Sequence, residues 1–411
     1  MFDHDPTDPH EVGLNADRLA VMPAYFKTNY IDTGKVPCMG LLVSRGGEMA
    51  HESYTGATEM GGKEPISAET IFRIYSMTKP ITTLAIMMLL EECKIRLDHP
   101  VSRYIPEYRN AMVWDGGTAA APKLRKPDRE MTVLDLVTHT SGLTYGFLFQ
   151  DETDEIYRIS KVGHPKDTLQ DMARQIGQLP LAFSPGTEWR YSHSIDVLGA
   201  LVEIISGQPL DEFFRERIFG PLGMVDTDFW VPPEKIHRLM ACYQKDAKTG
   251  ETTLADPAGA ASKLYAKRPN LLNAGGGLAS TMRDYHRFAL MLMRGGTLDG
   301  ARIISPKTWE FMRQNHLPEN QTMRGMGRSA FTEVMADGVG FGLGGSVVTD
   351  IVQTRQPGSD GTFSWGGLAS TFFWIDPEEE LIAIQATQLM PSSTYPMRMH
   401  FQQLVYSAID W

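Results

Sequence analysis

The N-terminal part of the chain changes from a helical to an extended pattern. Asn15-Ala16-Asp17-Arg18-Leu19 opens a predicted helix that runs to about Tyr30. Residues 39–44 and 49–54 read as two strands. The intervening Arg45-Gly46-Gly47-Glu48 predicts a hairpin turn, because paired glycines tolerate the positive φ that such turns need. A helix followed by an antiparallel hairpin is typical of an α+β fold and not of a Rossmann fold.

A nearly continuous apolar run lies between residues 78 and 92. A helix that is apolar on almost every side is a buried one, so the run predicts a helix in the core. Thr132-Val133-Leu134-Asp135 resembles a capping box and predicts the start of another helix. Residues 151–205 are interpreted as mostly helical with polar loops. The Gly-, Pro- and charge-rich residues 106–129 are interpreted as a long surface loop.

The last third of the chain returns to extended patterns. Residues 340–344 read as a glycine-rich strand. Residues 362–375 and 381–388 flank the turn 376–380, which predicts a second hairpin. From Met397 to Ile409 the apolar residues recur at helical spacing, which predicts a terminal helix.

Strand-forming ends therefore bracket a helical middle. The simplest architecture is an α/β fold of the α+β type, with one antiparallel sheet flanked by helices and a mostly helical domain inserted into it. Residues 1–100 and 266–411 would form the two parts of the sheet domain, and residues 101–265 the insertion.

Composition narrows the possible partners. The 411 residues are 42% apolar, enough for a large core, and 39 basic against 50 acidic residues give a net charge of -11. This balance argues against a nucleic-acid partner and against docking on an anionic membrane. The longest apolar run, residues 81–90, is too short to span a bilayer, which needs ~20 apolar residues. The sequence leaves the oligomeric state open.

The cysteines and the N-terminus bear on the compartment. Cys38, Cys93 and Cys242 are odd in number and far apart, which does not suggest a disulfide framework. Residues 1–6 lack the positive start and the apolar stretch of a signal peptide. We therefore expect a cytoplasmic protein.

Several common catalytic signatures are missing from the sequence. It contains no G-x-S-x-G elbow, no H-E-x-x-H and no P-loop. No Cys/His cluster has metal-ligand spacing, so we expect no metal site. Gly275-Gly276-Gly277 is interpreted as a tight backbone turn.

Ser76-Met77-Thr78-Lys79 stands at the start of the predicted buried helix. A spacing of three along a helix places Ser76 and Lys79 on one face. A serine hydroxyl needs a base to become a nucleophile, and a partly desolvated lysine can act as that base. The alternative is a helix-capping serine followed by a surface lysine.

Two further segments combine turn residues with aromatic side chains. In the polar run 184–194, Tyr191 could act as a base beside an ammonium group, or it could anchor a loop. His193 could be a catalytic histidine or a structural hydrogen bonder. In residues 363–370, the backbone N–H groups after Trp365-Gly366-Gly367 could form an oxyanion hole, or the glycines could allow strand packing.

Together these motifs resemble the serine β-lactamase and penicillin-binding-protein family, from about Asn15 to the end of the chain. Ser76-x-x-Lys79 matches the family's first motif. Tyr191-Ser192-His193 takes the place of Tyr-x-Asn, and Trp365-Gly366-Gly367 that of Lys-Thr-Gly. The resemblance implies the β-lactamase/transpeptidase-like fold. Trp365 is neutral, whereas the family usually has a cation at this position. This pattern most resembles the family VIII carboxylesterases, which cleave simple esters.

The resemblance implies a role for each residue. Ser76 would attack an ester carbonyl, with Tyr191 and Lys79 moving the proton. The N–H groups of Ser76 and Leu368 would form the oxyanion hole. Substrate would contact the residues Trp365, Gly366, Gly367 and His193. The expected partner is a small-molecule ester, with no cofactor.

The implied function is a serine carboxylesterase that hydrolyses short-chain esters through an acyl-enzyme on Ser76. One alternative is a β-lactamase or D-Ala-D-Ala carboxypeptidase. Another is an acyltransferase that uses the same acyl-enzyme. A non-catalytic penicillin-binding-like module is the remaining alternative, against which the intact Ser76, Lys79 and Tyr191 argue.

Overall fold

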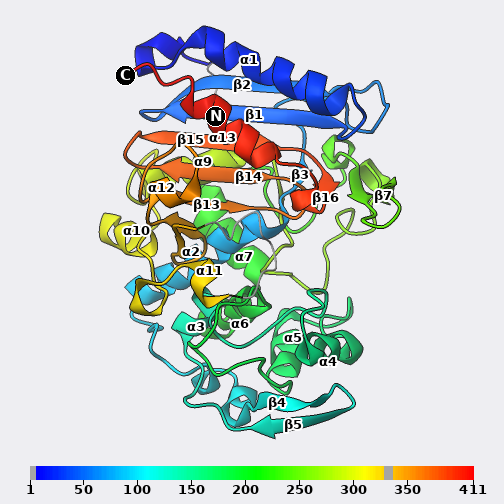
Figure 1. Ribbon diagram of the computed structural model, residues 1–411, viewed down its shortest axis with the longest axis vertical. Helices are drawn as coiled ribbons and strands as arrows, with labels where there is room; N and C mark the ends of the chain where they lie inside the picture. The colour runs from blue at the N-terminus through cyan, green and yellow to red at the C-terminus, as the bar shows by residue number, and fades with distance from the viewer. Residues whose placement is uncertain (1–5, 328–336) are drawn as a thin grey trace.

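A computed structural model describes residues 6–327 and 337–411, which form an antiparallel sheet with helices on both faces (Figure 1). Within these residues the large sheet has seven strands in the order β11-β12-β13-β14-β15-β1-β2. Its strands are β1 (Cys38–Arg45), β2 (Glu48–Gly56), β11 (Val339–Phe341), β12 (Ser346–Val348), β13 (Phe363–Gly366), β14 (Phe372–Asp376) and β15 (Leu381–Ala386). The pairing of β1 with β15 joins the two ends of the chain, as the patterns predicted.

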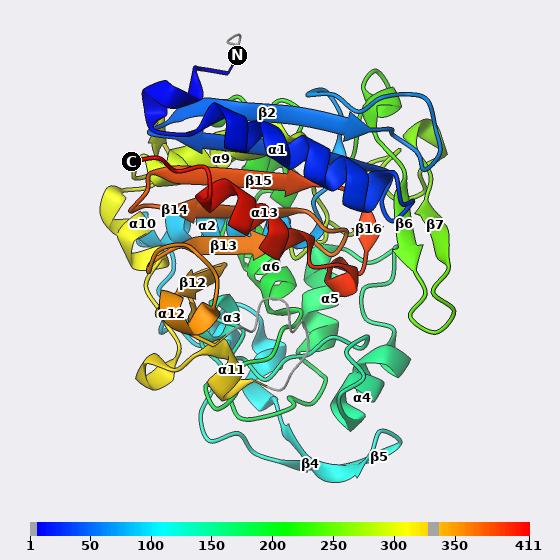
Figure 2. The same cartoon turned by 45° about the horizontal axis from the view of Figure 1, so that its top comes forward.

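The helices divide between the faces of the sheet and a separate helical region, with α1 and α13 in front of the sheet in Figure 2. The described helices are α1 (Ala16–Phe26), α2 (Thr78–Glu91), α3 (Val133–Val137), α4 (Glu152–Ser160), α5 (Leu169–Ile176), α6 (Ser194–Ser206), α7 (Leu210–Phe214), α8 (Gly220–Leu222), α9 (Met282–Met293), α10 (Pro306–Met312), α11 (Met323–Met326), α12 (Ile351–Thr354) and α13 (Met397–Tyr406).

Alternation along the strands separates two apolar cores. Leu41 and Val43 of β1 pack in the core that contains α1 and α13, whereas Leu42 faces the larger core that contains α2 and α9. Successive side chains of a strand point to opposite faces, so a sheet covered on both sides carries almost no exposed position. The burial of β14 and β15 along their whole length shows this.

The local signals for these elements are confirmed. The capping asparagine, Asn15, accepts from the N–H of Arg18, and α1 continues into a π-helical turn at Lys27–Ile31. The first hairpin turns at Gly46 and Gly47, whose φ angles are 61° and 87°. Thr132 caps α3 in a reciprocal capping box.

The prediction of a long surface loop at residues 106–129 is wrong. A 3-10 helix at Pro106–Asn110 is followed by a two-stranded ribbon of β4 (Val113–Thr118) and β5 (Ala121–Arg125). The ribbon is largely exposed, so its sequence lacks the apolar alternation that reveals a strand. A bulge accommodates Gly117, where a Cβ would lie 2.4 Å from the Ala121 oxygen.

Two predicted strands are shorter than expected. Residues 340–344 do not form one strand: β11 ends at Phe341, and Gly344, with φ 90°, turns the chain beside Thr83 of α2. Residues 362–375 form β13 and β14, separated by a turn in which the N–H of Gly367 donates to the Thr371 oxygen over 2.8 Å. A Cβ on Gly367 would lie 2.3 Å from the Ile74 oxygen, so glycine allows this turn to approach the start of α2.

Smaller sheets connect the helical region to the large sheet. β3 (Phe72–Arg73) pairs with β8 (Ala279–Ser280) just before α2, and β6 (Cys242–Lys245) lies between β7 (Thr252–Asp256) and β16 (Leu389–Met390). The short strands β9 (Thr297–Leu298) and β10 (Ala301–Arg302) follow α9. The domain boundaries at residues 100/101 and 265/266 stay predictions. In the described part of the chain, no helix is long and apolar enough to span a membrane.

A buried ion pair ties these segments together and yields a stability prediction. Arg73 is fully buried and donates to Asp256 and to the carbonyls of Met240 and Pro257. Arg73→Met would leave the Asp256 carboxylate buried without its cation, and we expect it to lower the free energy of unfolding by about 3–5 kcal/mol. Urea unfolding measures this change.

Arg96→Met is the matched control, because Arg96 pairs with Asp98 on the exposed surface. Its urea midpoint should stay at the wild-type value. An Arg73→Met variant as stable as the Arg96→Met variant would contradict the structural role assigned to Arg73.

Candidate active site

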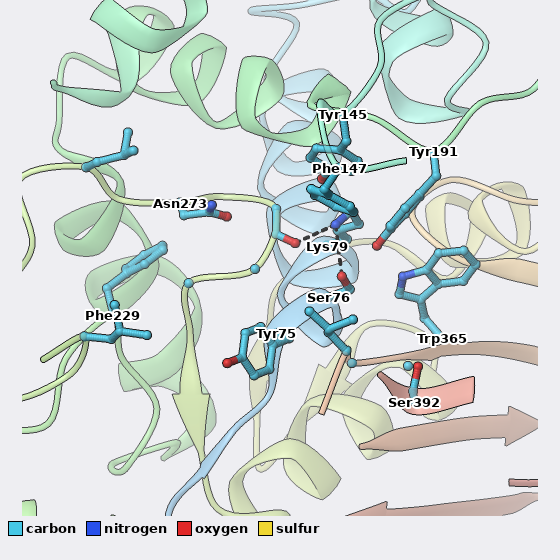
Figure 3. A pocket seen from close by; sticks show the side chains of 18 of the residues that line it. Tyr75, Ser76, Lys79, Tyr145, Phe147, Tyr191, Phe229, Asn273, Trp365 and Ser392 are labelled. Carbon is cyan, nitrogen blue, oxygen red and sulfur yellow. Dashed lines mark hydrogen bonds between the residues drawn. The ribbon is translucent and has the colours of Figure 1, made fainter. Parts of the chain in front are cut away.

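A cavity of about 350 Å³ lies where the sheet meets the helical region. Three segments that are far apart in the sequence supply its walls: the start of α2, the segment before α6, and the turn after β13. Figure 3 shows the side chains that surround it. Of the predicted residues, the cavity is lined by Ser76, Lys79, Tyr191, Trp365, Gly366, Gly367 and Leu368.

Ser76 sits in a single 3-10 turn, Tyr75–Met77, that leads directly into α2. The residue before it, Tyr75, has a φ of 43°, a left-handed conformation that is rare for an aromatic residue. The turn is held because the N–H of Met77 donates to the Ile74 oxygen over 3.0 Å. The serine is thereby presented at the cavity and not within a regular helix.

Lys79 is almost completely buried, with 2% of its surface exposed. Its Nζ lies 3.2 Å from the Ser76 Oγ and donates to the Gly275 oxygen over 2.6 Å (Figure 3). The alternative of a capping serine and a surface lysine is wrong, because Lys79 faces the interior and α2 has no side-chain cap. The geometry instead places an ammonium donor against the serine hydroxyl.

Tyr191 completes this group. Its ring centroid lies 4.4 Å from the Lys79 Nζ, within the range of a cation–π contact. Figure 3 shows its hydroxyl pointing toward Ser76 and Lys79. The side chain is 7% exposed and packs against Trp365, with ring centroids 5.6 Å apart.

The His139 ring packs against the ring of Tyr191. Its ring lies 4.9 Å from the Tyr191 ring, and the N–H of Arg190 donates to its carbonyl over 2.9 Å. Complete burial, and secondarily the positive charge of Lys79, holds the pKa of His139 well below 6.5. Its imidazole is therefore neutral at physiological pH.

The motif Trp365-Gly366-Gly367 contributes backbone atoms and one indole ring to the cavity wall. Trp365 is 3% exposed, and the turn after it brings Gly367 and Leu368 to the cavity beside the segment that carries Ser76. A Cβ on Gly366 would lie 2.4 Å from the Arg398 guanidinium, so a side chain there would require Arg398 to move. The backbone of Ser76 and that of Leu368 thus border the same space.

His193 lies apart from the other predicted site residues. It is not among the described residues that line the cavity. Its Nδ1 is 2.9 Å from Asp196, and its ring packs edge-on against Tyr145 with centroids 4.3 Å apart. This position fits the structural hydrogen bonder that the sequence left open, and the predicted contact with substrate has no support from it.

Sequence reasoning missed several wall residues. Tyr145 and Phe147 stack at a centroid distance of 4.7 Å, and Phe147 is 54% exposed at the mouth. Burial, then Asp196 and Tyr191, raises the pKa of Tyr145 well above 10, so it stays neutral. Gly275 was interpreted as part of a turn, which residues 274–276 do form, but its carbonyl also binds Lys79. The run of three glycines was the only signal for this contact.

The side chains that could ligate a metal are dispersed across residues 6–327 and 337–411. No group of three or more His, Cys, Asp or Glu side chains converges there in an arrangement that could hold a metal ion.

Comparisons with known proteins bear on the family and the fold of this chain. The family model described as Beta-lactamase matches residues 26–406. An uncharacterized protein of Mycobacterium tuberculosis is 37% identical over 341 residues, which cover 82% of each chain. Esterase EstB of Burkholderia gladioli is 29% identical, with 90% of each chain covered. The structure titled EstCE1, a hydrolase with promiscuous acyltransferase activity, superposes with a TM-score of 0.77 at 26% identity and covers 95% of this chain and 99% of its own.

The buried His139 generates a prediction for stability against pH. Its pKa is lower in the folded than in the unfolded state, so the unfolded chain binds the proton first as the pH falls below about 6.5. This group alone lowers the free energy of unfolding by up to ~1.4 kcal/mol per pH unit in that range. In His139→Gln we expect the loss between pH 7 and pH 5.5 to shrink by about 1 kcal/mol.

Urea unfolding at the two pH values measures this loss. The exposed His10 provides the control, and His10→Gln should keep the wild-type dependence. An unchanged dependence in His139→Gln would show that His139 is not the neutral, buried group described above.

Proposed function

This chain belongs to the Beta-lactamase family, and we propose that it is a serine carboxylesterase that hydrolyses short-chain esters through an acyl-enzyme on Ser76. The observation that carries the proposal is the buried Lys79 ammonium, 3.2 Å from the Ser76 Oγ and 4.4 Å from the centre of the Tyr191 ring. A serine hydroxyl needs a neighbouring proton acceptor to attack a carbonyl carbon, and the Tyr191/Lys79 pair is that acceptor once one of its two groups has lost a proton.

In acylation, Ser76 Oγ attacks the ester carbonyl and loses its proton to the Tyr191/Lys79 pair. The tetrahedral oxyanion is stabilised by the backbone N–H groups of Ser76 and Leu368. As the C–O bond to the alcohol breaks, the pair returns the proton to the leaving oxygen. General base catalysis contributes ~10²–10⁴-fold and an oxyanion donor ~10²–10³-fold.

Deacylation reverses the roles. Water replaces the alcohol, loses a proton to the Tyr191/Lys79 pair and attacks the acyl carbonyl. The acid leaves, and the proton returns to Ser76 Oγ. Each step uses groups that this chain supplies.

The character of the cavity favours uncharged, compact substrates. Its volume of about 350 Å³ is at the small end of the range for ligand sites, and most of its wall is aromatic or aliphatic. Trp365 stands where the family usually places a cation for a substrate carboxylate. The similarity to a Burkholderia protein named as an esterase supports the same substrate class.

Removing the proposed nucleophile tests the function. Ser76→Ala should lower kcat/KM for p-nitrophenyl butyrate by at least ~10³-fold, because the members of a catalytic unit fail together. Tyr191→Phe should cause a loss of similar size with the fold intact. Intact mass spectrometry should detect an acyl adduct, or a fluorophosphonate adduct, on wild-type protein and not on Ser76→Ala.

Tyr108→Phe is the control for the lost phenol. Tyr108 is also buried, but its hydroxyl donates to the Ala173 oxygen outside the cavity. We expect wild-type turnover from it. Full activity in Ser76→Ala would end the assignment, and faster turnover of a chromogenic cephalosporin than of the ester would favour a β-lactamase.

Acyl transfer is the second candidate. The observation that favours it is the close structural similarity to a protein titled a hydrolase with promiscuous acyltransferase activity. The acyl-enzyme is the same in both reactions, and only the acceptor differs. The exposed apolar side chains at the cavity mouth, Phe147 and Leu264, could bind an alcohol acceptor.

Competition between acceptors separates the two functions. Turnover of p-nitrophenyl butyrate in the presence of 1-butanol should give butyric acid as the main product, because the proposed function uses water. Gas chromatography of both products measures the ratio. Butyl butyrate as the main product at low alcohol concentration would assign the chain as an acyltransferase.

A further inference from the structure

Asp196 is a buried carboxylate that the proposed mechanism does not use. It lies in the first turn of α6, three residues after the N-cap His193, and is 1% exposed. The positive end of a helix dipole stabilises a carboxylate at this position. A buried charge also needs direct partners, and the partners of Asp196 lead to the cavity.

Both carboxylate oxygens are engaged. The N–H of Gly275 donates to Oδ1 over 2.9 Å, and Oδ2 lies 2.9 Å from His193 Nδ1. An ionised carboxylate is only an acceptor, so Nδ1 carries the imidazole proton. This pairing accounts for the position of His193 outside the cavity wall.

Gly275 connects the carboxylate to Lys79. Its carbonyl accepts from Lys79 Nζ over 2.6 Å, and the neighbouring Ala274 carbonyl accepts from Thr82 over 2.7 Å. The segment 274–275 is therefore fastened to α2 by two side chains and to α6 by Asp196. A Cβ on residue 275 would lie 3.2 Å and 3.3 Å from the Asp196 oxygens, so the carboxylate packs directly on the glycine.

We propose that Asp196 is a positioning residue, which fixes Gly275 against the Lys79 ammonium and whose negative charge compensates the positive charge of that buried group. The proposal rests on the proposed acyl-enzyme function. It assigns to Asp196 and His193 a role in the reaction without contact with the substrate.

Several ionisable side chains surround Asp196 and Lys79, and burial keeps three of them neutral. Tyr145 and, from the 3-10 helix Pro106–Asn110, Tyr108 face Asp196, and burial keeps the pKa of both phenols well above 10. His139, from the segment after α3, faces Lys79 and is neutral for the same reason. Tyr191 faces Lys79, and His193 faces Asp196 from the start of its own helix. Of these groups, Asp196 and Lys79 carry opposite charges, and the Arg398 guanidinium, which donates to the Gly367 oxygen, is a further cation of the cavity wall.

Asp196→Asn tests the charge while it keeps an acceptor for the Gly275 N–H. Without the carboxylate, the positive charge of Lys79 loses its compensation, and the acid limb of the kcat/KM profile should move to lower pH. A less basic lysine is also a weaker proton acceptor, so kcat should fall about 10-fold, with KM within about 2-fold of wild type. The measurement is the pH–rate profile for p-nitrophenyl butyrate.

Asp284→Asn is the matched control. Asp284 is buried at 5% exposure and occupies the same place after the N-cap of α9, but its contacts are Thr227 and the Asp226 N–H, away from the cavity. We expect its acid limb to coincide with that of wild type. If the acid limb of the kcat/KM profile moved equally in both variants, the role of Asp196 would be structural only.

Gly275→Ala separates position from charge, and it serves if Asp196→Asn does not fold. The added methyl group presses on the carboxylate without removing it, so kcat should fall while the acid limb stays in place. Wild-type kcat in this variant, or wild-type profiles in Asp196→Asn, would overturn the proposal. Failure of the proposed function is a different result, because the wild-type protein would then neither turn over the ester nor become acylated at Ser76.

Discussion

The burial of the Lys79 ammonium is the constraint around which the cavity is built. Desolvating a charge in an apolar interior is costly unless polar partners replace the lost water. Three groups replace the lost water around Lys79: the Gly275 carbonyl, the Ser76 hydroxyl and the face of the Tyr191 ring. Each partner comes from a different part of the chain, so placing this one charge requires the whole fold to close correctly.

The same requirement explains the glycines at the site. Gly275 must bring its carbonyl to Lys79 while Asp196 packs against its other side. Gly367 must pass within contact of the Ile74 backbone so that the turn after β13 reaches the segment of Ser76. A methyl group at residue 367 would overlap the Ile74 backbone, and one at residue 275 would press on the Asp196 carboxylate, so the glycines permit the close approach of segments that are far apart in sequence.

The surroundings of the group are mostly neutral. Burial keeps the Tyr145 phenol and the His139 imidazole uncharged, and Trp365 adds an aromatic ring to the cavity wall. The proton transfers proposed between Ser76, Tyr191 and Lys79 would therefore take place near few competing charges.

The sequence by itself determined the elements whose signals are local. The buried α2, the capping box of α3, the glycine turn of the first hairpin and the family motifs at Ser76, Tyr191 and Trp365 were all predicted from short stretches of residues, and the fold class and family are confirmed. Only the tertiary structure decided the exposed ribbon of β4 and β5, the turn that divides β13 from β14, the place of His193 beside Asp196, and the contact of Gly275 with Lys79. The physical reason is that these features depend on what approaches a backbone from elsewhere in the chain: an exposed strand has no burial pattern to reveal it, and a carbonyl that binds an ammonium from another helix carries no sequence signature of its own.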